Sequence, residues 1–438
     1  MKFRSLLNGS LLVSFREALF SGVAPDGSLY VPESIPALPA DAMNPDTAHT
    51  LPSVAAQVLG LYIDEIPFEQ LQRMVDGAFS FPIPLVKLED DLSLLELFHG
   101  PTLAFKDVGA RFMASALSYF LEQEHRELTI AVATSGDTGS AVAQGFLNIP
   151  HISVFVLYPS GKISTLQEQQ IATVGGNIHA VEVEGTFDDC QHLVRTALAD
   201  RELVRARNLT TANSINLGRL IPQITYYVWG LLELQRQADW EIDRKLAADV
   251  CVPSGNFGNI TAAAYAKRMG APITNLFSAS NANEVVPDFF RTGSFRPRPS
   301  LQTLSNAMDV GNPSNFARLQ SLYDNNFAAM KNDISSTSVS DEETLVEMRR
   351  TYEHSGTILD PHTAVGVAAT RRLKATRASS GPTIVMGTAH PAKFPAVVTK
   401  ALGITIPLPR QLQEALQRTK QSTRIPAEYG RVKKLLMS

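Results

Sequence analysis

The first part of the chain carries apolar residues at helical spacing. They recur every three or four positions over residues 14–20, 52–59 and 68–78, a spacing that places them on one face of a helix. A proline-rich stretch follows at residues 81–85, and it interrupts regular structure because proline lacks a backbone N–H. We therefore predict an N-terminal, mainly helical subdomain over residues 1–95.

Beyond this region, apolar runs alternate with amphipathic stretches. Runs rich in β-branched residues fit strands that are buried on both faces of a parallel sheet, and they lie at residues 129–133, 152–157, 180–183, 248–252 and 383–386. Helical patterns lie between strands, at residues 141–146, 164–173 and 187–198. This alternation favours open α/β sheets with right-handed crossovers. In such sheets, ligands bind at the carboxyl ends of the strands.

Composition narrows the class of protein. A chain of 438 residues is long for one core and predicts two or three domains. Its 44% hydrophobic and 19% charged residues are the balance of an ordinary globular enzyme. A net charge of −4 without a basic block gives no attraction for nucleic acid or an anionic membrane. The sequence has no apolar run of about 18 residues, the length of a membrane span. Cys190 and Cys251 show no metal or redox spacing, which favours a reducing cytoplasm.

A single lysine stands out between residues 95 and 107. The apolar run breaks at Gly100 and Pro101, and a helical pattern follows Lys106 closely. Apolar neighbours such as Phe98 and Phe105 would desolvate the amine, and a helix N-terminus disfavours its ammonium form. Both effects favour a neutral amine, which is a nucleophile toward carbonyl groups. A lysine that simply extends past its apolar neighbours into solvent fits the same pattern.

The stretch around this lysine resembles a family motif. Residues 96–107 read Glu-Leu-Phe-His-Gly-Pro-Thr-Leu-Ala-Phe-Lys-Asp, which is similar to the pyridoxal-phosphate (PLP) lysine motif of the threonine synthases. Further matches run from the first residues to Phe394. The resemblance implies that Lys106 binds PLP covalently and is catalytic.

The same resemblance implies a fold and a division into domains. The fold is that of the fold type II PLP enzymes, α/β with two open, mostly parallel sheets and flanking helices, together with the N-terminal subdomain. The expected PLP-binding core spans residues 96–405 and includes a smaller mobile sub-domain at roughly residues 108–210. A C-terminal helical tail spans residues 406–438.

One loop of small and polar residues joins a predicted strand to a predicted helix, Thr134-Ser135-Gly136-Asp137-Thr138-Gly139. Its backbone can approach a ligand, and free N–H groups at a helix start favour an anion; a capped turn fits equally well. The resemblance implies that Ser135, Asp137 and Thr138 bind substrate and that the loop holds its α-carboxylate. Relatives often carry asparagine at the place of Asp137, near the 3′-oxygen of the PLP ring, so the role of this carboxylate stays open.

A second loop follows the strand at residues 248–252 and precedes an alanine-rich helix at residues 261–268. Two glycines free its backbone to curl, so that successive N–H groups converge on an anion. This is the strongest anion site in the sequence. The resemblance implies that the loop binds the PLP phosphate through Gly255, Asn256, Phe257, Gly258 and Asn259. It also implies that Thr388, just after the last predicted strand, hydrogen-bonds the pyridine nitrogen.

A third polar cluster, at residues 212–219, contains one arginine and precedes an apolar helix. A helix cap by Asn213 or Ser214, with a surface arginine, is one interpretation. The resemblance implies another, in which Asn213, Ser214 and Arg219 bind the phosphate of the substrate. The planar fork of a guanidinium suits a phosphate group.

Three more polar residues bear on the chemistry. Lys162 follows a glycine, but its surroundings lack the spacing of a nucleotide-binding loop, so we expect a solvated charge. His362, at a predicted helix start, fits an acid/base group or simple packing equally well. Lys393 lies outside the motif that carries the PLP lysine.

Together these matches predict a threonine synthase, a PLP-dependent carbon–oxygen lyase acting on a phosphate ester. The implied reaction converts O-phospho-L-homoserine and water to L-threonine and phosphate by γ-elimination and β-hydration, the last step of threonine biosynthesis. Two alternatives fit the same residues: a phospho-lyase that releases 2-oxobutyrate, and a non-catalytic PLP-binding protein. We expect a small-molecule substrate and no nucleic acid, membrane or metal partner, in a cytoplasmic monomer or homodimer.

Overall fold

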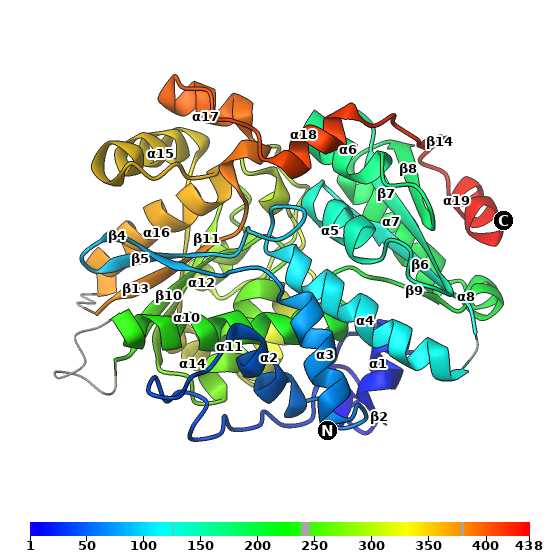
Figure 1. The fold of residues 1–438 in the computed structure, drawn as a ribbon, viewed down its shortest axis with the longest axis horizontal. Helices are drawn as coiled ribbons and strands as arrows, with labels where there is room; N and C mark the ends of the chain where they lie inside the picture. Colours follow the sequence, from blue (N-terminus) through cyan, green and yellow to red (C-terminus); the bar gives the residue numbers. More distant parts are fainter. Residues whose placement is uncertain (125, 238–245, 378–380) are drawn as a thin grey trace.

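Two open sheets lie side by side, with helices packed on their faces (Figure 1). The structure is a computed structural model that describes residues 1–124, 126–237, 246–377 and 381–438. Among the described strands of the two sheets, only the pair β4 and β5 is antiparallel. The prediction of an α/β fold with two open, mostly parallel sheets is confirmed.

The larger sheet has the strand order β12-β11-β10-β13-β5-β4 and lies on the left in Figure 1. Its strands are β4 (Leu85–Glu89), β5 (Leu92–Glu96), β10 (Ala248–Pro253), β11 (Ile273–Ser280), β12 (Ile334–Ser338) and β13 (Thr383–Gly387). The register aligns Val385 of β13 with Cys251 on one side and Leu94 on the other. A strand from late in the sequence therefore fills the middle of this sheet.

The smaller sheet has the order β14-β8-β7-β6-β9 and lies on the right in Figure 1. Its strands are β6 (Leu128–Ala133), β7 (Ile152–Pro159), β8 (Ile178–Glu184), β9 (Leu209–Thr210) and β14 (Thr423–Pro426). All of its described pairs are parallel. The strands predicted at residues 129–133, 152–157 and 180–183 are confirmed as its centre.

Strand residues alternate between separate cores. Successive side chains of a strand point to opposite faces of the sheet. In β6, Ile130 and Val132 join the largest core, which also contains residues of the N-terminal segment, whereas Ala131 and Ala133 pack with residues of the helices behind the small sheet. Both faces are apolar, which explains the continuous apolar runs in the sequence.

The helices cover these faces. Those predicted between the first strands are confirmed, as is the alanine-rich helix after β10. The core helices are α4 (Lys106–Glu124), α5 (Asp137–Gly145), α6 (Thr165–Ala172), α7 (Phe187–Ala199), α8 (Arg201–Arg207), α9 (Leu217–Leu220), α10 (Ile224–Gln237), α11 (Gly258–Arg268), α12 (Val285–Thr292), α13 (Phe316–Leu322), α14 (Phe327–Asp333), α15 (Asp341–Ser355), α16 (Pro361–Arg377) and α17 (Pro395–Leu402). Short 3-10 turns are η1 (Ile221–Gln223), η2 (Asn306–Met308) and η3 (Pro391–Lys393).

The N-terminal segment packs beneath both sheets in the view of Figure 1. Its helices are α1 (Phe15–Ser21), α2 (Leu51–Gly60) and α3 (Phe68–Ala78), and all three were predicted. Ser14 precedes α1 and caps it: its side chain accepts from Glu17 N–H, and the Glu17 side chain accepts from Ser14 N–H. Three short strands form a separate antiparallel sheet of order β2-β1-β3: β1 (Phe3–Ser5), β2 (Leu12–Val13) and β3 (Tyr30–Pro32). Strands β4 and β5, which lie next to the predicted domain limit at residue 95, belong to the larger sheet. The limit itself stays a prediction.

The last part of the chain crosses to the smaller sheet. The expected helical tail contains α18 (Arg410–Gln417) and α19 (Tyr429–Met437), and β14 lies between them. Strand β14 pairs in parallel with β8, with Arg424 opposite Glu182. The tail therefore completes one edge of the sheet as well as adding helices. Within the described ranges, no helix is both long and apolar enough to cross a membrane.

Candidate active site

The predicted site residues line one narrow cavity of about 80 Å³. Its walls come from the loops after β6, β10 and β13, which bring together the carboxyl ends of strands from both sheets, the expected place for a ligand. All thirteen predicted residues line it, namely Lys106, Ser135, Asp137, Thr138, Asn213, Ser214, Arg219, Gly255, Asn256, Phe257, Gly258, Asn259 and Thr388. The structure thus brings these residues close together, while their individual roles stay predictions.

Lys106 is the first residue of α4 and projects toward the cavity. The turn before it uses Leu103 in a left-handed conformation (φ 61°), and Phe105 N–H donates to Thr388 O at 3.0 Å. The lysine side chain is only 16% exposed. Burial lowers its pKa, while Asp137 acts in the opposite direction and the charges of Lys393 and Arg219 add to the lowering. The expected tendency toward a neutral amine is therefore present.

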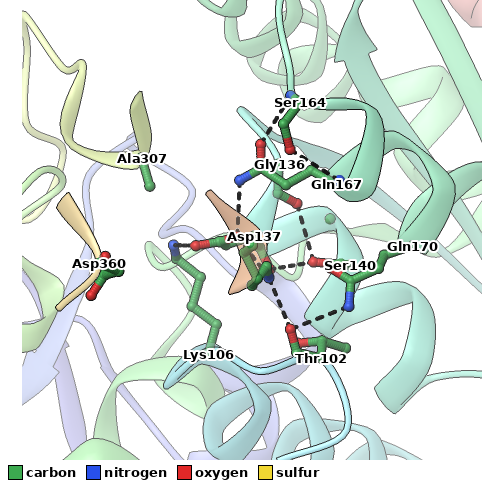
Figure 2. A network of polar contacts seen from close by, with 12 residues as sticks. Thr102, Lys106, Gly136, Asp137, Ser140, Ser164, Gln167, Gln170, Ala307 and Asp360 are labelled. Atoms are coloured by element: carbon green, nitrogen blue, oxygen red, sulfur yellow. Dashed lines mark hydrogen bonds and ion pairs between the residues drawn. The ribbon is translucent and has the colours of Figure 1, made fainter. Parts of the chain in front are cut away.

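Asp137 lies between two lysines (Figure 2 shows its contact with Lys106). Its Oδ2 is 3.8 Å from Lys106 Nζ, and its Oδ1 is 2.8 Å from Lys393 Nζ. Gln167 Nε2 also donates to Oδ1 at 3.0 Å. Burial alone would raise the pKa of this carboxyl, but the positive charges of Lys393 and Lys106, with His362, hold it well below its usual range. Asp137 is therefore a buried carboxylate with two cationic neighbours.

The loop that carries Asp137 is fixed from within and from outside. Thr134 Oγ1 accepts hydrogen bonds from Gly136 N–H at 2.9 Å and Gly139 N–H at 2.8 Å. Gly136 has φ 131°, and a Cβ there would lie 2.4 Å from the Gln167 side chain. Only glycine therefore permits Gln167 to reach Asp137. Because two backbone donors are satisfied by Thr134, an anion at this helix start would bind the remaining N–H groups and the hydroxyls of Ser135 and Thr138.

The loop after β10 forms a curled cradle at the start of α11. Phe257 adopts the left-handed conformation (φ 62°) immediately before the first helical residue, Gly258. A Cβ on Gly255 would approach Ala307 O to 2.8 Å and Met308 Cα to 2.9 Å, so the loop packs directly on η2. Free N–H groups at the start of an eleven-residue helix favour a phosphate.

Asn259 supplies a donor to the same cradle. Its Oδ1 accepts hydrogen bonds from the hydroxyls of Tyr226 and Tyr227, which fix the amide. Its Nδ2 is buried and has no partner among the described residues. Buried donors are nearly always paired in native proteins, so this one indicates an acceptor that the chain itself does not provide. A PLP phosphate fits the cradle.

Arg219 is a buried cation in the cavity wall. The residue is 2% exposed, which excludes the surface arginine considered above. Its Nη1 donates to Ala212 O at 2.6 Å, while its buried Nε has no partner, and no described carboxylate forms an ion pair with it. Burial lowers the pKa of the guanidinium to about 10, which leaves it charged at neutral pH. The buried Asp107 acts on this charge from beyond ion-pair distance. A buried guanidinium with no carboxylate in direct contact and an unpaired Nε indicates an anionic ligand.

Asn213 and Ser214 contribute differently. The Asn213 amide is engaged with the end of β6, accepting from Ala133 N–H at 3.1 Å and donating to Ala133 O at 2.8 Å. Ser214 Oγ accepts from Asn315 Nδ2 at 3.1 Å. The expected cap by one of these residues is wrong, because Asn216 caps α9. The cap could not be assigned from sequence because three neighbouring residues have suitable side chains.

His362 is held by both ring nitrogens. Its Nε2 accepts from Ala307 N–H at 3.1 Å, so Nδ1–H donates to Asp360 at 2.8 Å. The ring lines the cavity, but neither nitrogen is free, which favours packing and positioning over proton transfer. Pro361 at the start of α16 is confirmed, and Lys162 is exposed as expected.

A larger cleft of about 1390 Å³ adjoins the cavity. It lies between the N-terminal segment and helices α7 and α8. The two spaces share four lining residues, Ala133, Asn213, Ser214 and Asn256. The shared wall places the cavity next to the surface of the molecule.

Sequence reasoning missed several residues that build the site. Lys393 and Gln167 hold Asp137, two tyrosines hold Asn259, and the buried Arg318 donates to Ile215 O and to Ser214 O beside the cavity. Asn315, which binds Arg318 and Ser214, lies in a stretch similar to the family, and that similarity was the available signal.

Comparisons with known proteins agree with this geometry. Residues 81–388 match the family described as pyridoxal-phosphate dependent enzyme. Residues 2–79 match the threonine synthase N terminus, and residues 363–436 match the threonine synthase C-terminal family.

Individual relatives cover the whole chain. A threonine synthase of Escherichia coli is 40% identical over 439 residues, covering 100% of both proteins. The crystal structure of threonine synthase from Escherichia coli has a TM-score of 0.91 and covers 100% of this chain and 99% of its own. That of PLP-bound threonine synthase from Brucella melitensis has a TM-score of 0.90 at 35% identity, with 100% and 99% covered. The chain therefore belongs to the threonine synthase family of pyridoxal-phosphate-dependent enzymes.

Proposed function

We propose that the protein converts O-phospho-L-homoserine and water to L-threonine and phosphate, with PLP bound to Lys106. The observation that carries the proposal is the buried guanidinium of Arg219, which has an unpaired Nε and no described carboxylate in ion-pair contact, and which lines the same cavity as Lys106. A substrate with a phosphate at one end and an amino acid at the other would satisfy both ends of the cavity. Membership of the threonine synthase family supports the same reaction.

The cofactor fits the residues present. Lys106 supplies the amine, the cradle of Gly255, Asn256, Phe257, Gly258 and Asn259 supplies donors for its phosphate, and Thr388 lies beside both in the cavity wall. When bound, PLP provides an electron sink that stabilises negative charge at the carbon atoms next to the substrate amine. We assign Thr388 to the pyridine nitrogen, because a hydroxyl can donate or accept there without imposing a charge.

Lys106 carries the proton transfers in this proposal. When the Lys106 amine is not bound to PLP, burial lowers its pKa and so favours its neutral form. A neutral amine can accept a proton from the α-carbon. Only after it has passed that proton on can it accept one from the β-carbon, and as an ammonium group it can then return a proton to the product. The start of α4 holds the amine at the cavity wall, so the base is already in place.

Arg219 binds the leaving group. The ester phosphate gains negative charge as its C–O bond breaks, and a guanidinium buried away from water stabilises that charge more strongly than a solvated one. Ser214 and the loop of Ser135 and Thr138 complete the wall, the loop holding the α-carboxylate. Asn213 positions the end of β6 through its Oδ1 and one of its two Nδ2 hydrogens, and it also lines the cavity, so its predicted contact with the substrate uses the second hydrogen.

Water completes the reaction by adding to the β-carbon after phosphate leaves. The decisive experiment measures phosphate and threonine together during turnover of O-phospho-L-homoserine by the PLP-loaded protein. Equal amounts of both are expected. Phosphate released with 2-oxobutyrate in place of threonine would overturn the hydration step, and release of neither would overturn the activity.

The proposal extends to the state of the protein in the cell. Both cysteines are buried and unpaired, as suits a reducing compartment, and we infer a cytoplasmic enzyme. We also infer a monomer or homodimer. Light scattering of the purified protein tests the second inference, because a higher oligomer would contradict it.

A further inference from the structure

Lys393 is a second buried lysine behind the cavity. It ends η3, five residues after Thr388, and its side chain is 0% exposed. Its Nζ lies 2.8 Å from Asp137 Oδ1 and donates to Thr102 O at 2.8 Å. It is not among the residues that line the cavity. Lys393 therefore contacts the site only through Asp137 and the backbone before Lys106.

The carboxylate of Asp137 is shared between this lysine and Lys106. One oxygen faces Lys393 and Gln167. The other faces Lys106 across 3.8 Å, the contact that Figure 2 draws. Burying an ion pair carries a desolvation cost of several kcal/mol per ion. Asparagine at position 137 and a neutral residue at position 393 would avoid that cost. We therefore look for a function of this buried ion pair in the chemistry of the site.

The charges matter through their effect on Lys106. A lone carboxylate beside a buried amine favours the ammonium form, whereas a lone cation disfavours it. With Lys393 in place, the pair is neutral overall, and Asp137 stays ionised without dominating Lys106. The other charged groups near this cluster are Arg219 from α9, which acts on Lys106, and the buried Asp107 from α4, on which Lys393 acts. His362 from α16 also lies beside it, as a neutral imidazole that accepts from Ala307 N–H and donates to Asp360.

We propose that Lys393 is a positioning residue that keeps Asp137 ionised and aimed at Lys106, while its own charge prevents that carboxylate from holding Lys106 as an ammonium. The proposal rests on the proposed function only in taking Lys106 as the reactive amine. It also gives Asp137 a role. Its carboxylate is neutralised by Lys393 on one side, so it can orient the Lys106 amine on the other side without keeping that amine protonated.

The test measures the neutral fraction of Lys106 in the PLP-free protein. Only a neutral amine is nucleophilic, so the rate of acetylation by acetic anhydride at each pH, read by mass spectrometry, reports its titration. Exposed Lys162 in the same sample is the internal reference. In Lys393→Met, the midpoint should move up by about 1 to 3 pH units, because Lys106 then faces Asp137 alone.

Two further variants should shift the Lys106 titration midpoint in directions that the proposal fixes in advance. Asp137→Asn removes the carboxylate that lies 2.8 Å from Lys393 Nζ and leaves only the more distant Asp107 to offset that charge, so the Lys106 midpoint should move down. The double variant Lys393→Met/Asp137→Asn removes both charges and should return close to the wild-type midpoint. A purely structural role for Lys393 in holding Thr102 O would not be repaired by Asp137→Asn. If Lys393→Met does not fold, Asp137→Asn and the double variant still give the opposed shift and its reversal.

Lys267→Met is the matched control, because Lys267 forms a 2.7 Å ion pair with Asp333 outside the cavity. It should leave the Lys106 midpoint unchanged. An unchanged midpoint in Asp137→Asn, or a double variant that fails to reverse the shift, overturns the role of Lys393 whether or not the enzyme makes threonine. Conversely, the expected shifts in a protein that makes no threonine would uphold the role of Lys393 and reject the proposed reaction.

Discussion

The two walls of the cavity that we propose to bind anions are built by different means. The wall after β10 is a neutral cradle, made of backbone curled around Gly255 and of the fixed amide of Asn259. The opposite wall is charged and holds Lys106, Asp137 and Arg219. The cradle depends on close packing, whereas the charged wall depends on a balance of buried charges. Substitutions that change the size of a side chain should therefore impair the cradle, and substitutions that remove a charge should impair the charged wall.

The largest effect is expected on the charged wall at Lys106. Lys106→Ala removes the base and the attachment for PLP, so turnover should fall at least about 10⁴-fold. Lys106→Arg should fail similarly, because a guanidinium stays protonated. Threonine release is the measurement, with circular dichroism to confirm folding. Full activity in either variant would remove Lys106 from its assigned role.

Arg219 should show the next largest effect. Truncating one partner of a buried charge pair costs about 2–5 kcal/mol, so Arg219→Leu should lower kcat/KM for O-phospho-L-homoserine by about 30-fold to a few thousand-fold. PLP affinity should hardly change, because the cradle is separate. Steady-state kinetics on the PLP-loaded variant measure the first quantity, and equilibrium dialysis measures the second.

Arg318 offers a matched control for that variant. It is also buried but does not line the cavity, and it donates to backbone oxygens of Tyr30, Ile215 and Ser214 and to the Asn315 side chain, so it acts on the site only by holding Ser214 in place. Arg318→Leu should lower the free energy of unfolding more than it alters phosphate recognition. Near-normal kcat/KM in Arg219→Leu would return Arg219 to a structural role.

The cradle can be tested by shape alone. Gly255→Ala places a methyl group 2.8 Å from Ala307 O, whereas the nearest atom to a new Cβ at Gly258 lies at 3.4 Å. Overpacking costs about 1–3 kcal/mol, so Gly255→Ala should weaken PLP binding clearly and Gly258→Ala should do so less. Dissociation constants for PLP from dialysed protein give the comparison. Equal affinities in the two variants would mean that packing on η2 does not shape the cradle.

The smallest effect is expected outside both walls. Lys162 is exposed and does not line the cavity. Lys162→Ala should change stability by less than about 0.5 kcal/mol and leave kcat/KM unaltered. Thermal unfolding and steady-state kinetics check this, and a marked loss of activity would show that charge beyond the cavity wall contributes to substrate binding.

The loops of the site could be predicted because each is a local feature of the chain. The residues around Asp137 and Gly255 follow apolar strand runs directly, so their place at the carboxyl ends of strands followed from the pattern. Lys106 could be placed at a helix start for the same reason. Local sequence also explained α1, whose cap is formed by residues three positions apart.

The remaining contacts depend on distant packing. Lys393 donates to Thr102, which lies 291 residues earlier, so no local pattern could pair them. The burial of Arg219 follows from the close packing of α4, where Gly109 lies against the Arg219 backbone, and its own neighbours fitted a surface position equally well. Strand β14 escaped prediction because it has four residues in a polar tail and two of them are exposed.

The strand order also constrains how the chain is made. Strand β13 separates β10 from β5, and β14 covers the edge of β8, so the larger sheet cannot be completed before residue 387 has left the ribosome, nor the smaller one before residue 426. Until then, apolar strand edges lack their neighbours, a state prone to wrong pairing. Thr388 and Lys393 follow β13 directly. A nascent chain therefore cannot assemble all the residues of the predicted PLP site, together with Lys393, before residue 393 has left the ribosome.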